Sequence, residues 1–491
     1  MGMTNTLARA MERTSNLTET QNGAVALSST GDKVLNLFST IGALRGAEKN
    51  RTIRLWKEAF AENADLAMKT LFYARDVRGG LGERDVFRTI LRYAAETSPE
   101  SVKKNLPFVG YFGRFDDLYC LVGTKCEKAM WTCMKDQFEK DKKAMEDGKP
   151  ISLLAKWIKT PNSSSENTRK LGIQTALHLG YKVSAFKPIL SKMRKYLDIP
   201  EIKMVANQWD TICYDKVPAK CMLRYRSIFK KHDEERFSSY LEDVRSGKSE
   251  IKAGTLYPYD IVRKYLNGIE RDADVMELQW KALPNYAGDK NILVVADVSG
   301  SMEQNGNTPL STSIGLAMYF AERNKGAFHN MFMTFSESPS IEVIEGDTLL
   351  ERIQNLQDAD WGYNTNLDSV FEELLYLSKE NNVPQEEMPE AIVIVSDMEV
   401  DRGLRNKKDQ TFYDHWKQVF AENGYNIPNV VFWNVNSTSD VFHFDADRVG
   451  VQAFSGSSVS TFKSILRCLD MTPVEAMMEV LSDERYSCIV A

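Results

Sequence analysis

The chain has 491 residues, of which 43% are hydrophobic and 26% are charged, values typical of a soluble globular protein with two to four domains. No apolar run is long enough to span a membrane, and the N-terminus lacks the apolar core of a signal peptide, so neither a membrane span nor secretion is expected. The seven cysteines are odd in number and form no C-x-x-C pair, which favours free thiols in the cytoplasm over disulfides or a zinc site.

The net charge of −6 hides an uneven distribution along the chain. Residues 1–270 hold 46 Lys and Arg against 33 Asp and Glu, a net charge of +13. Residues 290–491 hold 14 against 31, a net charge of −17. Such asymmetry predicts two parts with different partners, and the positive part is a candidate for binding a polyanion.

The part before residue 290 has the periodicity of helices and few strand patterns. Apolar residues in Glu83–Ser98, for example, recur at the spacing that places them on one helix face. Helices are predicted at Thr52–Arg75, Glu83–Ser98, Glu127–Glu146, Arg169–Leu179, Ala185–Leu197, Lys220–Lys231 and Tyr257–Leu266. Because no clean repeat is present, the expected fold of this part is an irregular α-helical solenoid or bundle.

One stretch of the helical part combines basic and aromatic residues. Around a polar loop lie Lys156, Trp157, Lys159, Arg169 and Lys170. Aromatic planes stack on bases and nearby cations neutralise phosphates, so these residues are candidates for binding single-stranded or structured RNA. The alternative is a helical scaffold in which the aromatic rings belong to the core and the lysines are solvated.

From about Lys290 apolar runs alternate with helix patterns, which predicts an α/β domain with a helix-covered sheet. Strands are expected at Ile292–Ala296, Asn330–Phe335, Ser340–Ile344, Ala391–Val395, Val430–Asn434 and Gly450–Phe454. Helices are expected at Ser311–Asn324, Thr348–Leu356, Leu367–Glu380, Thr411–Asn423 and Ser460–Leu469.

Two of the expected strands, Ile292–Ala296 and Ala391–Val395, are continuously apolar, as central parallel strands are. Asp297 and Asp397 follow them directly. In such sheets ligand sites lie beyond the carboxyl ends of the strands. The two carboxylates are therefore expected at one edge of the sheet.

Hydroxyl groups accompany these carboxylates, and together they form a candidate metal site: Asp297, Ser299, Ser301, Thr365 and Asp397. All five side chains offer hard oxygen donors, which Mg²⁺ and Mn²⁺ prefer. Two carboxylates balance the charge of a divalent ion, and neutral hydroxyls leave it electrophilic. The simpler alternative is capping of strand ends by Asp and Ser.

The motif DVSGSM, with Thr365 and Asp397 downstream, resembles the metal-ion-dependent adhesion site of von Willebrand factor A domains. The resemblance covers roughly residues 288–470 and implies a doubly wound α/β fold. It also implies that Ser299, Ser301 and Thr365 bind the ion directly, while Asp297 and Asp397 act through waters. An acidic group of a protein partner would complete the coordination.

A helical region followed by an A domain resembles the Ro autoantigen, whose TROVE ring of helices binds RNA. The motifs RGGLGERDVF, GRFDDL and LLAKWIK look closer to an uncharacterised relative of that family, found in plants, fungi and large viruses. This second resemblance spans about residues 20–490 and implies no established activity. The predicted domains are a TROVE-like, HEAT-like helical domain (1–280), an A-like domain (288–470) and a C-terminal extension (471–491).

Three functions follow from these patterns. The first is a ribonucleoprotein component, with RNA on the helical part and a protein partner at the metal. The second is a metal-dependent protein scaffold without RNA. The third, an enzyme, is disfavoured because Asp297-x-Ser299 lacks the second acid of a phosphotransferase loop, and the nuclease-like acids Asp397, Glu399 and Asp401 have no evident base nearby.

Overall fold

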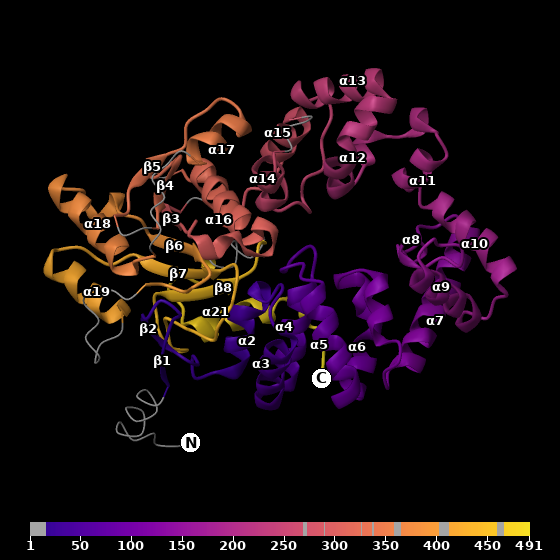
Figure 1. The fold of residues 1–491 in the computed structure, drawn as a ribbon, viewed down its shortest axis with the longest axis horizontal. Helices are drawn as coiled ribbons and strands as arrows, with labels where there is room; N and C mark the ends of the chain where they lie inside the picture. Colours follow the sequence, from indigo (N-terminus) through magenta and orange to yellow (C-terminus); the bar gives the residue numbers. More distant parts are fainter. Residues whose placement is uncertain are drawn as a thin grey trace. The chain divides into compact units, whose positions relative to one another are not determined.

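The computed structural model describes residues 16–268, 273–288, 290–325, 327–335, 338–357, 365–401, 412–458 and 466–491. The chain forms two compact units (Figure 1). Met1–Asn63 and Leu256–Asp483 form the α/β unit, and Ala64–Thr255 and Glu484–Ala491 form the helical unit. The units are therefore not divided at the boundaries expected from the sequence (1–280, 288–470 and 471–491), because both ends of the chain pack with residues distant in sequence.

The centre of the α/β unit is a six-stranded sheet in the order β5-β4-β3-β6-β7-β8. Its strands are β3 (Ile292–Ala296), β4 (Met331–Thr334), β5 (Ile341–Val343), β6 (Ala391–Ser396), β7 (Asn429–Asn434) and β8 (Val451–Ser455). β5 pairs antiparallel with β4, and all other neighbours are parallel. Every residue of β3 and β6 is buried, which explains their uninterrupted apolar sequences.

Helices flank this sheet (Figure 1). The helices of the unit are α2 (Lys33–Thr40), α3 (Lys49–Glu62), α14 (Pro258–Leu266), α15 (Ala273–Lys281), α16 (Gln304–Arg323), α17 (Leu349–Gln357), α18 (Leu367–Glu380), α19 (Phe412–Glu422) and α21 (Pro473–Leu481). α16 packs on β3, β4 and β6, whereas α2 and α21 pack on β8. Gly42 allows the close approach of the chain after α2, because a Cβ there would lie 2.6 Å from the backbone of Ser455.

The N-terminal residues add a hairpin that the sequence analysis did not predict. β1 (Leu17–Glu19) pairs antiparallel with β2 (Val25–Leu27). Leu27 in turn forms a β-bridge with Phe442, so the hairpin belongs to the α/β unit. Each strand has only three residues, too few for an alternating pattern to be recognised in the sequence.

The described residues of the helical unit form helices and no strand. The α-helices are α4 (Ala64–Arg75), α5 (Asp85–Thr97), α6 (Pro99–Phe112), α7 (Glu127–Glu146), α8 (Leu154–Trp157), α9 (Glu166–His178), α10 (Val183–Tyr196), α11 (Pro200–Val205), α12 (Ala219–His232) and α13 (Glu234–Arg245). Helices near in sequence pack on one another, as α4, α5 and α6 do, which agrees with the helical fold expected for this part. None of the described helices of either unit combines the length and apolar character that a bilayer crossing needs.

The single helix predicted at Thr52–Arg75 is wrong. Asn63 is extended, with φ −151° and ψ 102°, and separates α3 from α4. The apolar periodicity continues across this break, but the chain leaves the α/β unit and enters the helical unit there. Most of the helix predicted at Ser460–Leu469 lies outside the described residues.

The last eight residues belong to the helical unit. Tyr486 is buried, and its ring stacks on Phe112 with centroids 5.6 Å apart. Both carboxylate oxygens of Asp76 accept hydrogen bonds from the guanidinium of Arg485, one of them at 2.8 Å. Since Asp76 is fully buried, this pair ties the C-terminal segment to the helices.

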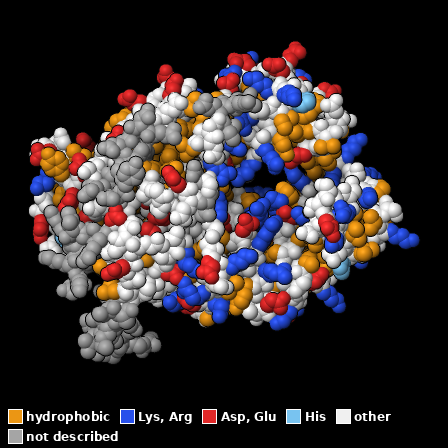
Figure 2. Space-filling model, viewed as in Figure 1, with side chains coloured by type: hydrophobic (Ala, Val, Ile, Leu, Met, Phe, Trp, Pro, Cys, Tyr) orange, Lys and Arg blue, Asp and Glu red, His pale blue; other side chains and the backbone are white. Residues whose placement is uncertain are grey.

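The two units also differ in charge. The helical unit contains 37 Lys and Arg against 26 Asp and Glu, a net charge of +11. The α/β unit contains 25 against 42, a net charge of −17. Figure 2 shows many Lys and Arg side chains on the viewed face of the helical unit. The charge asymmetry of the sequence therefore follows the division into units.

Candidate metal site and basic region

Asp297 and Asp397 lie at the same edge of the sheet. Asp297 follows β3 and Asp397 follows β6, and these parallel strands are neighbours in which Ala296 is paired with Val395. The amide of Asp297 continues the ladder by donating to the carbonyl of Val395 at 3.0 Å. The strand ends thus place both carboxylates together, as expected.

The carboxylate of Asp297 is fully buried and held by two neighbours. Oδ1 accepts from the amide of Ser299 at 2.9 Å, and Oδ2 accepts from the hydroxyl of Ser396 at 2.6 Å. Burial raises the pKa of Asp297 although these hydrogen bonds oppose the rise. The sequence analysis overlooked Ser396, the last residue of β6, because a lone Ser at a strand end carries no motif.

Asp397 is less completely hydrogen-bonded. Its Oδ1 accepts from the amide of Glu399 at 3.1 Å, whereas its Oδ2 is buried without a hydrogen-bond partner among the described residues. Burial, followed by the charge of Asp297, raises the pKa of Asp397 to about 6, and the hydroxyl of Ser301 opposes this rise. An unpartnered buried carboxylate oxygen is costly unless another group binds it.

The three predicted hydroxyls join the same edge. The Oγ atoms of Ser299 and Ser301 are 3.0 Å apart. Thr365, just before α18, is buried; its hydroxyl donates to the carbonyl of Glu399 at 3.3 Å, and its amide donates to Oδ2 of Asp401 at 2.6 Å. Three separate loops therefore meet at this edge.

No basic residue neutralises the two carboxylates within the described parts of the chain. Neither Asp297 nor Asp397 forms an ion pair there, and the described residues contain no group of three or more His, Cys, Asp and Glu side chains that could hold a metal, so the hydroxyls are needed to complete this site. Two adjacent buried carboxylates, one unpartnered oxygen and nearby hydroxyls fit a hard divalent cation. A soft metal would require thiol or imidazole ligands instead.

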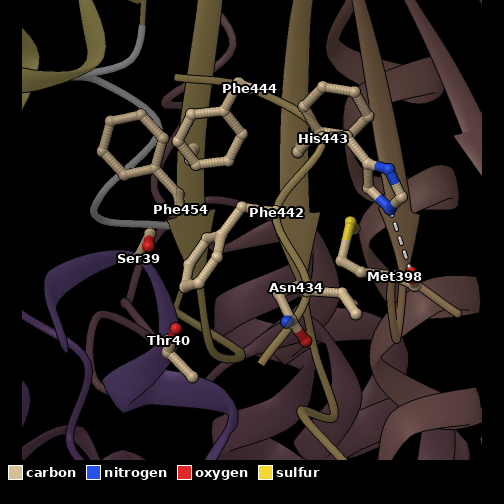
Figure 3. A pocket seen from close by; sticks show the side chains of 11 residues that line it. Ser39, Thr40, Met398, Asn434, Phe442, His443, Phe444 and Phe454 are labelled. Carbon is tan, nitrogen blue, oxygen red and sulfur yellow. Dashed lines mark hydrogen bonds between the residues drawn. The ribbon is translucent and has the colours of Figure 1, made fainter. Parts of the chain in front are cut away.

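The loop after β6 is strained at Met398, a non-glycine residue with φ 68°. Its carbonyl lies 3.0 Å from Nε2 of His443, which is half-buried (Figure 3). The Met398 side chain lines a small cavity in the α/β unit together with Phe442, Phe444 and other residues. The surroundings of Met398 therefore fix the backbone between the two acids Asp397 and Glu399.

Three of the five predicted RNA-binding residues are half-buried and already have partners. The ring of Trp157 lies 3.5 Å from the guanidinium carbon of Arg114, measured to the ring centroid. Lys156 pairs with Glu201 at 3.4 Å, and Lys159 lies 3.7 Å from Asp116. These contacts favour a structural role for Lys156, Trp157 and Lys159.

Arg169 and Lys170 lie on α9 and are exposed. Arg169 donates to the carbonyl of Ser163 at 3.2 Å, and Lys170 pairs with Glu166 one turn earlier. Such solvent-exposed contacts are weak and leave both cations accessible. α9 reaches this position because Gly172 has no side chain, since a Cβ there would lie 2.3 Å from the backbone of Thr160.

The acids beside the basic region have arginine partners. Asp117 is fully buried and accepts from Arg75 at 2.8 Å and from Arg88 at 2.7 Å. Asp116 pairs with Arg114 at 2.7 Å. The motif GRFDDL, noticed in the sequence for its charges, thus builds a buried ion-pair network.

The chain was compared with family models, with curated proteins and with solved structures. Two models, each described as a domain of unknown function, match the chain: DUF2828 over residues 20–138 and 181–289, and DUF7788 over residues 291–487. An uncharacterized protein of Acanthamoeba polyphaga mimivirus is 26% identical over 95% of this chain and 87% of its own length. The crystal structure of the Ro (RSR) protein of Deinococcus radiodurans aligns with a TM-score of 0.43 and 14% identity, covering 92% of this chain and 94% of that one.

Proposed function

We propose that the α/β unit is a von Willebrand factor A-type module that binds a divalent cation and, through it, an acidic group of a protein partner. The observation that carries this proposal is the buried pair Asp297 and Asp397, which has no basic partner among the described residues and keeps Oδ2 of Asp397 unpartnered. A divalent cation compensates two such carboxylates.

Each residue of the edge has a proposed part in holding the ion, which would be Mg²⁺ or Mn²⁺. Ser299, Ser301 and Thr365 supply neutral hydroxyl oxygens, and Asp297 and Asp397 supply negative charge through waters. A bound cation of this kind offers an electrophilic position to a carboxylate. The α/β unit has a net charge of −17, so the ion would allow an acidic group to approach this surface.

Calorimetric titration of the full chain with MnCl₂ tests the proposal. We expect the parent to bind one ion and Asp297→Asn to bind at least about 100-fold more weakly, because the charge facing the ion is lost. Glu386→Gln, which removes an exposed acid of the same unit, is the matched control and retains the affinity of the parent. Equal binding by all three proteins would contradict the site.

We further propose that the helical unit binds RNA. The observation that favours this function is its net charge of +11, with exposed cations such as Arg169 and Lys170 on α9. A positive surface attracts a polyanion that the acidic α/β unit repels. The two proposals together describe a ribonucleoprotein component that also engages a protein.

Filter binding of the full chain to single-stranded RNA at increasing KCl tests the second proposal. If the protein binds RNA phosphates, the logarithm of the binding constant should fall linearly with the logarithm of the KCl concentration, with a slope of about −0.7 for each phosphate contact. Nucleic acid that co-purifies with the protein from its source would identify the ligand. No binding to RNA even at low salt, with metal binding intact, would leave the metal-dependent protein scaffold as the function.

A further inference from the structure

The N-terminal hairpin holds the loop that follows Asp397. The hydroxyl of Thr20 donates to the carbonyl of Val400 at 2.7 Å. The amide of Gln21 donates to the carboxylate of Glu399 at 2.8 Å, and the side-chain amide of Asn22 donates to the carbonyl of Glu399 at 2.6 Å. Three consecutive residues near the start of the chain thus contact the two residues that come shortly after Asp397.

A second contact comes from α3. Arg51 donates to the carbonyl of Ser437 at 2.6 Å and to the carboxylate of Asp440 at 2.9 Å. These bonds fix the segment after β7, from which the hydroxyl of Thr438 donates to the carboxylate of Glu399 at 2.9 Å. Glu399 is buried, and described hydroxyl and amide donors from distant parts of the unit satisfy its charge.

The same loop carries the contacts of Thr365. The carbonyl of Glu399 accepts from the Thr365 hydroxyl, and Asp401 accepts from the Thr365 amide. Asp401 also forms an antiparallel β-bridge with Gly23 of the hairpin. The positions of two residues of the proposed site, Asp397 and Thr365, therefore depend on a loop that residues 16–63 hold from outside the sheet.

We propose that the N-terminal segment, residues 16–63, positions the metal-binding loop, with Thr20 and Arg51 as its positioning residues. This inference rests on the metal site proposed above. Small displacements of ligands lower metal affinity strongly, and residues that orient ligands commonly affect it about 10–100-fold. Loss of the Thr20 hydroxyl would leave the Val400 carbonyl without its partner and free the loop to shift.

The test compares four full-length variants with the parent by titration with MnCl₂ and by thermal unfolding with and without the ion. Thr20→Val is the main variant, and Thr20→Ser restores the hydroxyl. Thr18→Val is the matched control, because Thr18 lies on β1 and its side chain makes no hydrogen bond to the loop among the described residues. Arg51→Lys keeps the positive charge but removes the planar guanidinium, which donates to Ser437 and Asp440 at the same time.

We expect Thr20→Val and Arg51→Lys to bind Mn²⁺ about tenfold more weakly, while Thr20→Ser and Thr18→Val match the parent. If Thr20→Val does not fold, the affinity of Arg51→Lys for Mn²⁺ tests the inference instead. The inference is overturned if both variants melt at lower temperature without metal yet keep the affinity of the parent, since the contacts would then be purely structural. A parent that binds no Mn²⁺ would instead overturn the metal site itself.

Discussion

Buried aspartates occur in both units, but their partners differ. In the helical unit Asp117 lies between Arg75 and Arg88, and Asp76 is paired with Arg485. In the α/β unit Asp297 and Asp397 have only amide and hydroxyl donors among the described residues. The first set is neutralised by side chains of the protein, whereas the second set is adjacent, of like charge and uncompensated.

This difference separates a structural acid from a functional one. A buried carboxylate with an arginine partner and saturated oxygens stabilises the fold and offers nothing to a ligand. A buried pair without a cation costs stability, and a protein retains it where another ion supplies the charge. Stability, pH dependence and binding each test this distinction.

The largest effect is expected for Asp117→Asn. The substitution leaves Arg75, which is only 2% exposed, and Arg88 without their shared carboxylate. The free energy of unfolding should fall by about 3–5 kcal/mol. Urea denaturation measures this loss, and Asp136→Asn, at an exposed position on α7, is the control. If the free energy of unfolding falls no more than in the control, Asp117 is not the structural acid that the comparison requires.

Asp297→Asn should change stability in the opposite direction when no metal is present. The substitution removes a buried charge that has no basic partner in the described chain, and Ser396 can still hydrogen-bond to the amide. The free energy of unfolding at pH 7 should rise by about 1–2 kcal/mol. Urea denaturation in EDTA measures it. A large loss, comparable with that of Asp117→Asn, would mean that Asp297 serves the fold alone.

Metal affinity should depend on pH near 6. Burial and the charge of Asp297 raise the pKa of Asp397 from its ordinary value of 3.8 to about 6. Below that pH the ion must displace a proton, so affinity should fall by about tenfold for each pH unit and level off above it. The metal-free protein should lose stability as pH rises from 3.8 to 6, because the folded state retains the proton longer than the unfolded state does. Titrations in MnCl₂ between about pH 5 and 7.5 would show a flat profile if Asp397 were uninvolved.

The smallest effect is expected for Arg169→Ala combined with Lys170→Ala. Both side chains are exposed, so the double variant should keep its stability and lower the salt slope of RNA binding by about 1.4, or about 0.7 for each lost phosphate contact. Lys156→Ala combined with Lys159→Ala should instead reduce stability, because these lysines pair with Glu201 and Asp116. An unchanged slope in the first variant would show that α9 does not face the RNA.

Local pattern was enough to find the sheet and its polar edge. The apolar runs ending at Asp297 and Asp397 predicted two central parallel strands, because a continuous apolar run is typical of a strand buried on both faces. The structure shows that these two strands are neighbours. Thr365 was a candidate because its hydroxyl comes just before a predicted helix, and the structure joins it to the same edge through Glu399 and Asp401. The sites remain predictions until an ion is measured.

Contacts between distant segments could not be predicted. Thr20 and Val400 are 380 positions apart, and neither local sequence contains a pattern that predicts their contact. For the same reason residues 16–63 were assigned to the helical part, although α2 packs on β8. Charge density likewise identified a basic region but not the partners of its members, since Arg114 covers the ring of Trp157 only after folding.

The division of the chain also constrains how the protein can be made. Gly42 packs against Ser455, and the native partner of Asp76 is Arg485, which comes 409 positions later in the chain. At a synthesis rate of about 5–20 residues per second, each partner follows after roughly 20–80 s. During that time α2 has α3 as a neighbour but lacks β8, and Asp76 accepts from the amide of Arg78 but lacks its arginine partner. The usual order, in which an N-terminal domain completes its fold before the rest emerges, therefore does not apply, because each unit completes its native contacts only after residues far along the chain have been made.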